Sequence, residues 1–172
     1  MPAASSVAPL DPERLITTLA RHQVRYILIG AVAARLQGFP RLTADTDITP
    51  AREPENLHRL ASALRELAAR VFTESVPEGL PFDCTAATLE RGQLWNLVTT
   101  AGRLDLIFEP RGTTGYDDLA KHAVQFEVFG VRLDVASLED IIRTKVAAGR
   151  AQDRQDVIVL REIIRLRGHG QQ

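Results

Sequence analysis

Residues 28–48 read LIGAVAARLQGFPRLTADTDI and combine a small-residue turn with two carboxylates. The apolar run just before the turn, residues 26–29, favours a β-strand, and Gly30-Ala31 ends it where an Ala-rich helical pattern begins. A strand, a tight turn and a helix leave backbone N–H groups free at the helix start, where phosphate binds readily. The stretch therefore predicts an α/β unit with a phosphate-binding turn.

Asp45 and Asp47 lie two residues apart in a second short β-type segment, which Pro50 ends. Because side chains alternate between the two faces of a strand, both carboxylates point the same way. Oxygen ligands of this kind suit a divalent cation. The pair by itself is a weak signal, since two acids at this spacing are common on protein surfaces.

A third acid, Asp105, strengthens the metal-site hypothesis. It lies in the β-rich run 103–108, in which Leu104, Leu106 and Phe108 share the opposite face. A charged residue in an apolar strand is costly unless it is paired or bound to a cation. Three carboxylates that converge on one sheet edge would need such a cation to stay ionised.

Alternating helical and β patterns run along the rest of the chain. Helices are predicted to begin at Pro12, at Pro54 and at Leu138 after a Ser137 cap. The remaining predictions are an edge strand followed by loop or a short helix in 71–94, a hairpin over 95–108, a short helix over 116–121 and a hairpin over 124–135. The helix that begins at Leu138 is followed by a last helix that carries Val157, Ile158, Leu160, Ile163, Ile164 and Leu166.

Composition narrows the class of protein. The chain has 172 residues, 45% hydrophobic and 25% charged, which predicts one globular domain. Apolar runs shorter than a membrane span and an N-terminus unlike a signal peptide predict a cytoplasmic protein that does not bind membranes. The single cysteine excludes an internal disulfide, and a net charge of −1 argues against a general nucleic-acid coat protein.

In this order the motifs resemble the minimal nucleotidyltransferases of the polymerase-β superfamily, especially the AbiEii/MenA-type toxins. That pattern has an apolar strand, Gly-Gly or Gly-Ser, a helix, Gly-x-x-Arg-x-Thr, Asp-x-Asp and a later third Asp. The matching segments here are Gly30-Ala31, Gly38 to Thr43, Asp45-Thr46-Asp47, Asp105 and, for the toxin type, a C-terminal block of Lys145, Gly149-Arg150, Asp153 and Asp156. Ala31 departs from the pattern, and it removes any hydroxyl contact to phosphate.

The resemblance implies an α/β (α+β) nucleotidyltransferase fold, a small mixed, twisted sheet flanked by helices with a helical C-terminal part. One domain would span residues 1–172, with a catalytic core over 10–135 and helices over 136–172 closing the cleft. The implied catalytic residues are Asp45, Asp47, Asp105 and Lys145. The three aspartates would bind metal, with Asp105 as third ligand or general base, and Gly30 and Ala31 would form a phosphate cradle. The residues implied to contact nucleotide or phosphate are Arg41, Thr43, Lys145 and Arg150, with support from Asp153 and Asp156.

The implied reaction is transfer of a nucleoside monophosphate from an NTP to a hydroxyl group, with Mg²⁺ or Mn²⁺, expected as two ions, as cofactor. The implied acceptor is RNA, above all tRNA, or a protein, and the implied role is the toxin of a toxin–antitoxin pair with a cognate antitoxin as partner. Two alternatives stay open. One is an antibiotic nucleotidyltransferase that modifies an aminoglycoside or lincosamide, and the other is a non-catalytic nucleotide-binding protein, which only Ala31 favours.

The individual motifs also have structural interpretations. Arg41 and Thr43 can belong to a solvated loop in which Thr43 caps a turn. Lys145 and Arg150 can be the cationic end of a helix that Gly149 stops. Asp153 and Asp156 can be acids in the first turn of the last helix.

Overall fold

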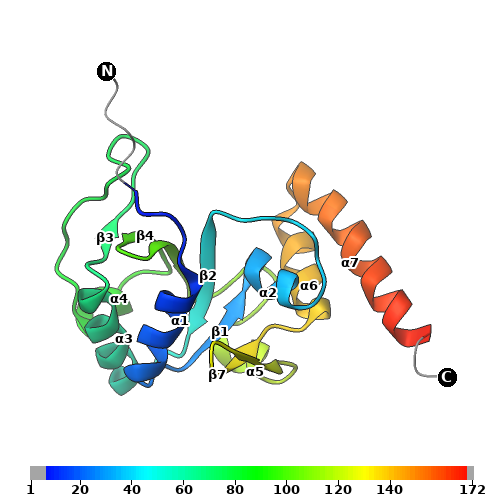
Figure 1. Cartoon of the computed structure of the whole chain (residues 1–172), viewed down its shortest axis with the longest axis horizontal. Helices are drawn as coiled ribbons and strands as arrows, with labels where there is room; N and C mark the ends of the chain where they lie inside the picture. Colours follow the sequence, from blue (N-terminus) through cyan, green and yellow to red (C-terminus); the bar gives the residue numbers. More distant parts are fainter. Residues whose placement is uncertain (1–6, 170–172) are drawn as a thin grey trace.

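The computed structural model describes residues 7–169, so the ends of the predicted domain, 1–6 and 170–172, lie outside the described residues. Its strands are β1 (Tyr26–Ile29), β2 (Asp45–Pro50), β3 (Arg70–Val71), β4 (Leu94–Thr99), β5 (Gly102–Ile107), β6 (Val124–Val128) and β7 (Val131–Val135). They form one seven-stranded sheet in the order β3-β4-β5-β2-β1-β7-β6. Figure 1 shows this sheet at the centre of the molecule.

The sheet is mixed, as predicted. β2 pairs with β5 and β1 pairs with β7 in parallel, while the other neighbouring strands are antiparallel. The predicted edge strand is β3, at one end of the sheet, and the two predicted hairpins are β4–β5 and β6–β7.

Helices account for most of the remaining chain. They are α1 (Pro12–Arg21), α2 (Gly30–Leu36), α3 (Pro54–Glu66), α4 (Ala86–Glu90), α5 (Tyr116–Ala120), α6 (Leu138–Ala148) and α7 (Ala151–His169). The predicted boundaries hold where capping chemistry was present in the sequence. The Asp11 side chain accepts from the Arg14 N–H, the Ser137 side chain accepts from the Asp140 N–H, and Gly149 ends α6 in the left-handed conformation.

The main core lies on one face of the sheet, against α1 and α3. The strand alternation predicted for β5 is confirmed, since Leu104 and Leu106 are fully buried while Asp105 faces the other way. The helices contribute Leu15, Ile16 and Leu19 from α1 and Leu57, Leu60 and Leu64 from α3. Asp105 therefore lies on the face of β5 opposite to the buried Leu104 and Leu106.

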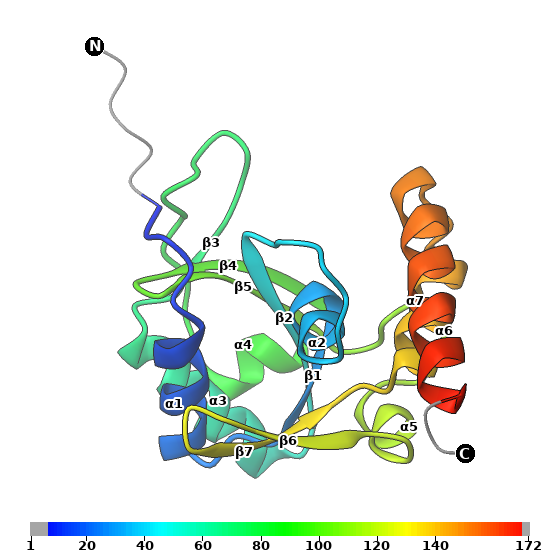
Figure 2. The ribbon, with the colours of Figure 1, turned by 45° about the vertical axis from the view of Figure 1, so that its right-hand side comes forward.

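Figures 1 and 2 show α1, α3 and α4 gathered on one side of β2, and α2, α6 and α7 on the other. The loop from α2 to β2 runs past the start of β2 on the side of α7. Over residues 7–169, no helix has both the length and the apolar character that a membrane span requires.

Replacing Ser137, the N-cap residue of α6, tests whether its side chain stabilises the start of this helix. Ser137→Ala should lower the free energy of unfolding by about 1 kcal/mol, because the N–H of Asp140 loses its side-chain acceptor in a buried setting. Ser62→Ala, inside α3 where the hydroxyl bonds only its own helix, is the matched control and should change stability little. Urea denaturation measures both, and equal effects would contradict the capping role.

Candidate active site

Three carboxylates meet where β2 and β5 pair. The parallel register places Asp47 beside Asp105 and Asp45 beside Arg103. One oxygen from each of Asp45, Asp47 and Asp105 lies within 4.8 Å of the others. The sequence predicted that Asp45 and Asp47 share a face, and the β2–β5 pairing brings Asp105 to the same place.

Gly30 makes room for this cluster. It starts α2 directly after β1, with φ +69°, a left-handed conformation that favours glycine. A Cβ atom built on Gly30 would overlap the Asp47 carboxylate. The predicted turn therefore has a feature that the sequence did not reveal, namely that one of the carboxylates packs against its glycine.

Burial and neighbouring negative charge make Asp47 and Asp105 hard to ionise. Burial, reinforced by the charges of Asp45 and Asp105, raises the pKa of Asp47 to about 7. Burial raises the pKa of Asp105 to about 6, although the Arg103 charge opposes the rise. Both shifts reflect negative charge held close together with little solvent.

This donor set fits a divalent cation. All three ligands are hard carboxylate oxygens, which Mg²⁺ and Mn²⁺ prefer. Oδ1 of Asp105 is buried and has no hydrogen-bond partner within residues 7–169. A buried carboxylate oxygen without a donor is costly unless a cation binds it. The acidic triad could therefore bind a metal ion.

The loop before β2 contributes one orienting contact. The Thr43 hydroxyl lies 2.7 Å from Oδ1 of Asp45 and also contacts the Asp45 backbone. Thr43 therefore caps a turn, as its structural interpretation predicted, and the same hydrogen bond orients one of the three carboxylates.

The C-terminal block forms a compact network of ion pairs. Nζ of Lys145 lies 2.8 Å from Asp156 and 3.4 Å from Asp153, and Nε of Arg150 lies 2.8 Å from Asp153. Arg41 joins the same network, with a guanidinium nitrogen 2.9 Å from Asp156. Asp153 is a first-turn acid of α7, as its structural interpretation predicted, whereas Asp156 lies one turn further along the helix. Both aspartates are buried, and together they bind all three cations.

This network faces the triad. The charge of Lys145 lowers the pKa of Asp47, and the charge of Asp47 contributes to the raised pKa of Arg150. The structure thus brings Lys145 and Arg150 near Asp47, which lies about 100 residues earlier in the chain.

Comparison with solved structures gives a match to the whole fold. A crystal structure from Thermotoga maritima, described as that of a "putative nucleotidyltransferase", aligns over 92% of this chain and 96% of that chain, with a TM-score of 0.54 and 18% sequence identity. This chain has a nucleotidyltransferase fold. No protein-family model and no curated protein sequence matches it.

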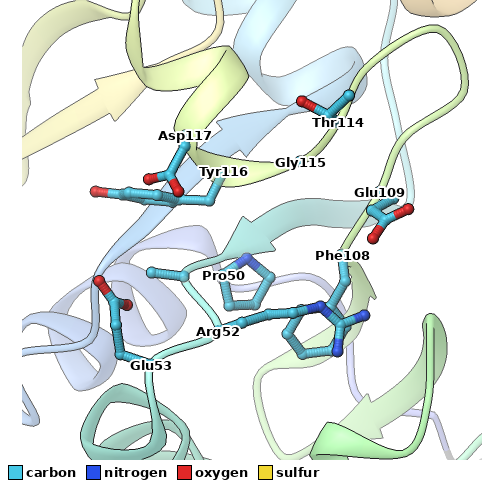
Figure 3. A pocket seen from close by; sticks show the side chains of 10 residues that line it. Pro50, Arg52, Glu53, Phe108, Glu109, Thr114, Gly115, Tyr116 and Asp117 are labelled. Atoms are coloured by element: carbon cyan, nitrogen blue, oxygen red, sulfur yellow. The ribbon is translucent and has the colours of Figure 1, made fainter.

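A cavity of about 230 Å³ in this nucleotidyltransferase fold lies away from the triad, at the other end of β2 (Figure 3). It is lined by Pro50, Arg52, Phe108 and Tyr116, among others. Pro50 is five residues beyond Asp45, about 16 Å along a strand. This cavity is therefore no part of the candidate active site.

Arg103 was not predicted as a site residue of the nucleotidyltransferase fold. Its guanidinium lies 3.8 Å from Oδ1 of Asp105 and 3.9 Å above the Phe72 ring centre. The available signal was its spacing, since Arg103 lies two residues before Asp105 and so shares its face. Because the chain contains many Arg residues, this spacing alone does not identify Arg103 as a site residue.

Substituting Gly30 tests the contact with Asp47. Gly30→Ala should abolish tight Mn²⁺ binding, because the new Cβ must displace the Asp47 carboxylate. Gly130→Ala is the matched control, since Gly130 has φ +72° and open space around it. Both variants should lose about 1–2 kcal/mol of stability from backbone strain, but calorimetric titration should show lost Mn²⁺ affinity only for Gly30→Ala. Normal Mn²⁺ binding by Gly30→Ala would contradict the assigned geometry.

Asp47→Asn should stabilise the metal-free protein. The pKa of Asp47 is about 7 in the fold, above its ordinary value of 3.8, so the native state binds more protons than the unfolded state between these pH values. Wild-type stability in chelator should therefore rise as pH falls from 8 to 5, and Asp47→Asn should raise the free energy of unfolding at pH 8 by about 1 kcal/mol or more. Thermal melts at pH 5 to 8 measure this. A variant with the wild-type pH slope would contradict it.

Proposed function

We propose that this chain is a metal-dependent nucleotidyltransferase that moves a nucleoside monophosphate from an NTP to a hydroxyl group of RNA, above all tRNA, or of a protein. The observation that carries the proposal is the juxtaposition of three carboxylates with a cluster of cations from the C-terminal block. A binding site for an NTP with its metal needs carboxylates to bind the metal and cations to bind the phosphates. The low-identity structural match adds the fold that supports such a site.

The proposed roles follow from position. Asp45, Asp47 and Asp105 would hold Mg²⁺ or Mn²⁺, in our proposal two ions, which neutralise developing charge on the transferred phosphoryl group. Lys145, Arg150 and Arg41 would contact the phosphates, and the N–H groups of Gly30 and Ala31 would add a cradle. Asp153 and Asp156 would support the cations, and Thr43 would support Asp45.

Proton transfer is assigned to Asp105. Its carboxylate is the third member of the triad, and its Oδ1 has no hydrogen-bond partner in the described part of the chain, so it would be available to accept a proton from the acceptor hydroxyl. The acceptor oxygen then bonds to the α-phosphorus, and the bond to the leaving oxygen breaks with release of pyrophosphate.

The proposed biological role is that of an AbiEii/MenA-type toxin in the cytoplasm, inhibited by a cognate antitoxin. The Lys145-to-Asp156 block favours this type over an antibiotic nucleotidyltransferase. The four charged residues that define this block, Lys145, Arg150, Asp153 and Asp156, form one network of ion pairs. In the proposed arrangement residues 10–135 form the catalytic core, and the helices after residue 136 close the cleft.

Label transfer tests the proposed function. The purified full chain is incubated with each α-³²P-labelled NTP, Mg²⁺ or Mn²⁺, and either total tRNA or an aminoglycoside. Label should enter tRNA with at least one NTP, and Asp47→Asn should reduce it by more than about 100-fold, because it removes a charged group at the reacting centre. Asp134→Asn, a strand aspartate on β7 near the far edge of the sheet, is the matched control.

No transfer to any acceptor, or an Asp47→Asn variant as active as wild type, would refute the enzyme proposal. Label on the aminoglycoside and not on tRNA would favour the antibiotic enzyme. Growth arrest on expression of wild type but not of Asp47→Asn would support the toxin role.

A further inference from the structure

Arg103 is a cation beside the triad whose donors are largely unused. Its nearest carboxylate contact, at 3.8 Å from Asp105, is longer than a hydrogen bond. Its Nε is buried and finds no acceptor in the described part of the chain. A guanidinium has five N–H donors, so the remaining donors of Arg103 are available to water or to a ligand.

Arg103 stacks on the ring of Phe72, a side chain that has no oxygen or nitrogen to accept a hydrogen bond. Phe72 follows β3, and its ring lies beneath the guanidinium, so the side chain is oriented by a cation–π contact. This leaves the edges of the guanidinium free, while the side chain keeps 27% of its surface exposed. An oriented, partly exposed guanidinium with free donors is suited to bind an anion bidentately.

Arg52 shows what a purely structural arginine looks like in this protein. It also stacks on a phenylalanine ring, 4.2 Å above Phe108 (Figure 3). Its terminal nitrogens, however, donate to the carbonyls of Glu90 and Gly92 and to the Gln93 side chain. The contrast indicates that stacking alone does not explain the free donors of Arg103.

Arg103 and Lys145 belong to elements that lie on opposite sides of β2. Arg103 is on β5, on the β4 side of β2, whereas Lys145 is on α6, which stands beyond α2 on the other side (Figures 1 and 2). Both act on the same carboxylate, since each lowers the pKa of Asp47. In an in-line displacement the attacking oxygen and the leaving group lie on opposite sides of the phosphorus.

We infer that Arg103 binds a phosphate group of the acceptor, so that the acceptor is a phosphate-bearing chain, an RNA, and not a cationic small molecule. The inference rests on the proposed function, in which the C-terminal cations bind the triphosphate and thereby leave the Arg103 side to the acceptor. Arg103 would hold a phosphate near the reacting hydroxyl. That hydroxyl bonds to the α-phosphorus, its proton passes to Asp105, and pyrophosphate leaves on the Lys145 side. A cationic aminoglycoside carries no phosphate for this guanidinium to bind.

Two variants separate charge from packing. Arg103→Lys keeps the charge but loses the planar fork, while Arg103→Met keeps an apolar stem on Phe72 and loses the charge. Fluorescence anisotropy with labelled total tRNA, at several salt concentrations, gives the RNA Kd and its salt slope. Calorimetric titration with each NTP in Mg²⁺ gives the NTP Kd of the same proteins.

Arg103→Met should weaken tRNA binding about 10-fold and lower the salt slope by about one phosphate contact, with NTP Kd unchanged. Arg103→Lys should keep most of the slope. Lys145→Ala should do the reverse, raising the NTP Kd and leaving tRNA binding near wild type. Arg52→Gln, the matched stacked arginine, should change neither Kd.

Wild-type tRNA affinity and salt slope in Arg103→Met would overturn the inference. An equal loss of NTP affinity would also overturn it, because Arg103 would then act through Asp105. So would label transfer to an aminoglycoside and not to RNA. Failure of the proposed function is a different result, in which wild type neither binds an NTP nor transfers label to any acceptor.

Discussion

Repulsion among Asp45, Asp47 and Asp105 is the constraint around which the active-site end of the sheet is built. The parallel pairing of β2 with β5 fixes all three on one face, and the buried leucines on the other face of β5 prevent that strand from turning. Gly30 lets one carboxylate sit directly against the turn. Hydrophobic packing thus holds together charges that would otherwise separate, which is a common arrangement at sites that bind cations.

Cations offset this negative charge in two different ways. Lys145 is tied by Asp153 and Asp156, so its charge is largely neutralised before any ligand arrives. Arg103 is held by an aromatic ring and keeps its donors free. A carboxylate must be displaced or shared before phosphate can bind the first cation, whereas the second needs no such exchange. The two cations are therefore chemically unequal.

Local sequence patterns predicted most of the helices and strands. They also predicted that Asp45 and Asp47 share a face, but not the strand pairing that brings Asp105 beside them. Alternation within a strand was enough to place Asp45 with Asp47 and to separate Asp105 from the core, and capping residues set the start of α1 and α6. The pairing of β2 with β5 is a contact between segments far apart in sequence, so periodicity could not supply it. Arg103 escaped notice for the same reason, since what distinguishes it from other arginines is the ring of Phe72 on the neighbouring edge of the sheet.

The geometry of Asp156 bears on how a phosphate could enter the C-terminal network. Its carboxylate is buried, and it accepts from Lys145, Arg41 and Gln152 at once. Removing the sole partner of a buried charge costs several kcal/mol, about 3–5, but Asp156 would keep two donors if Arg41 left. The Arg41 side chain is 46% exposed and lies on a loop, whereas that of Lys145 is 16% exposed and lies on a helix. Of the two cations that bind Asp156, Arg41 can therefore exchange this carboxylate for a ligand at the lower cost, while Lys145 keeps the network assembled.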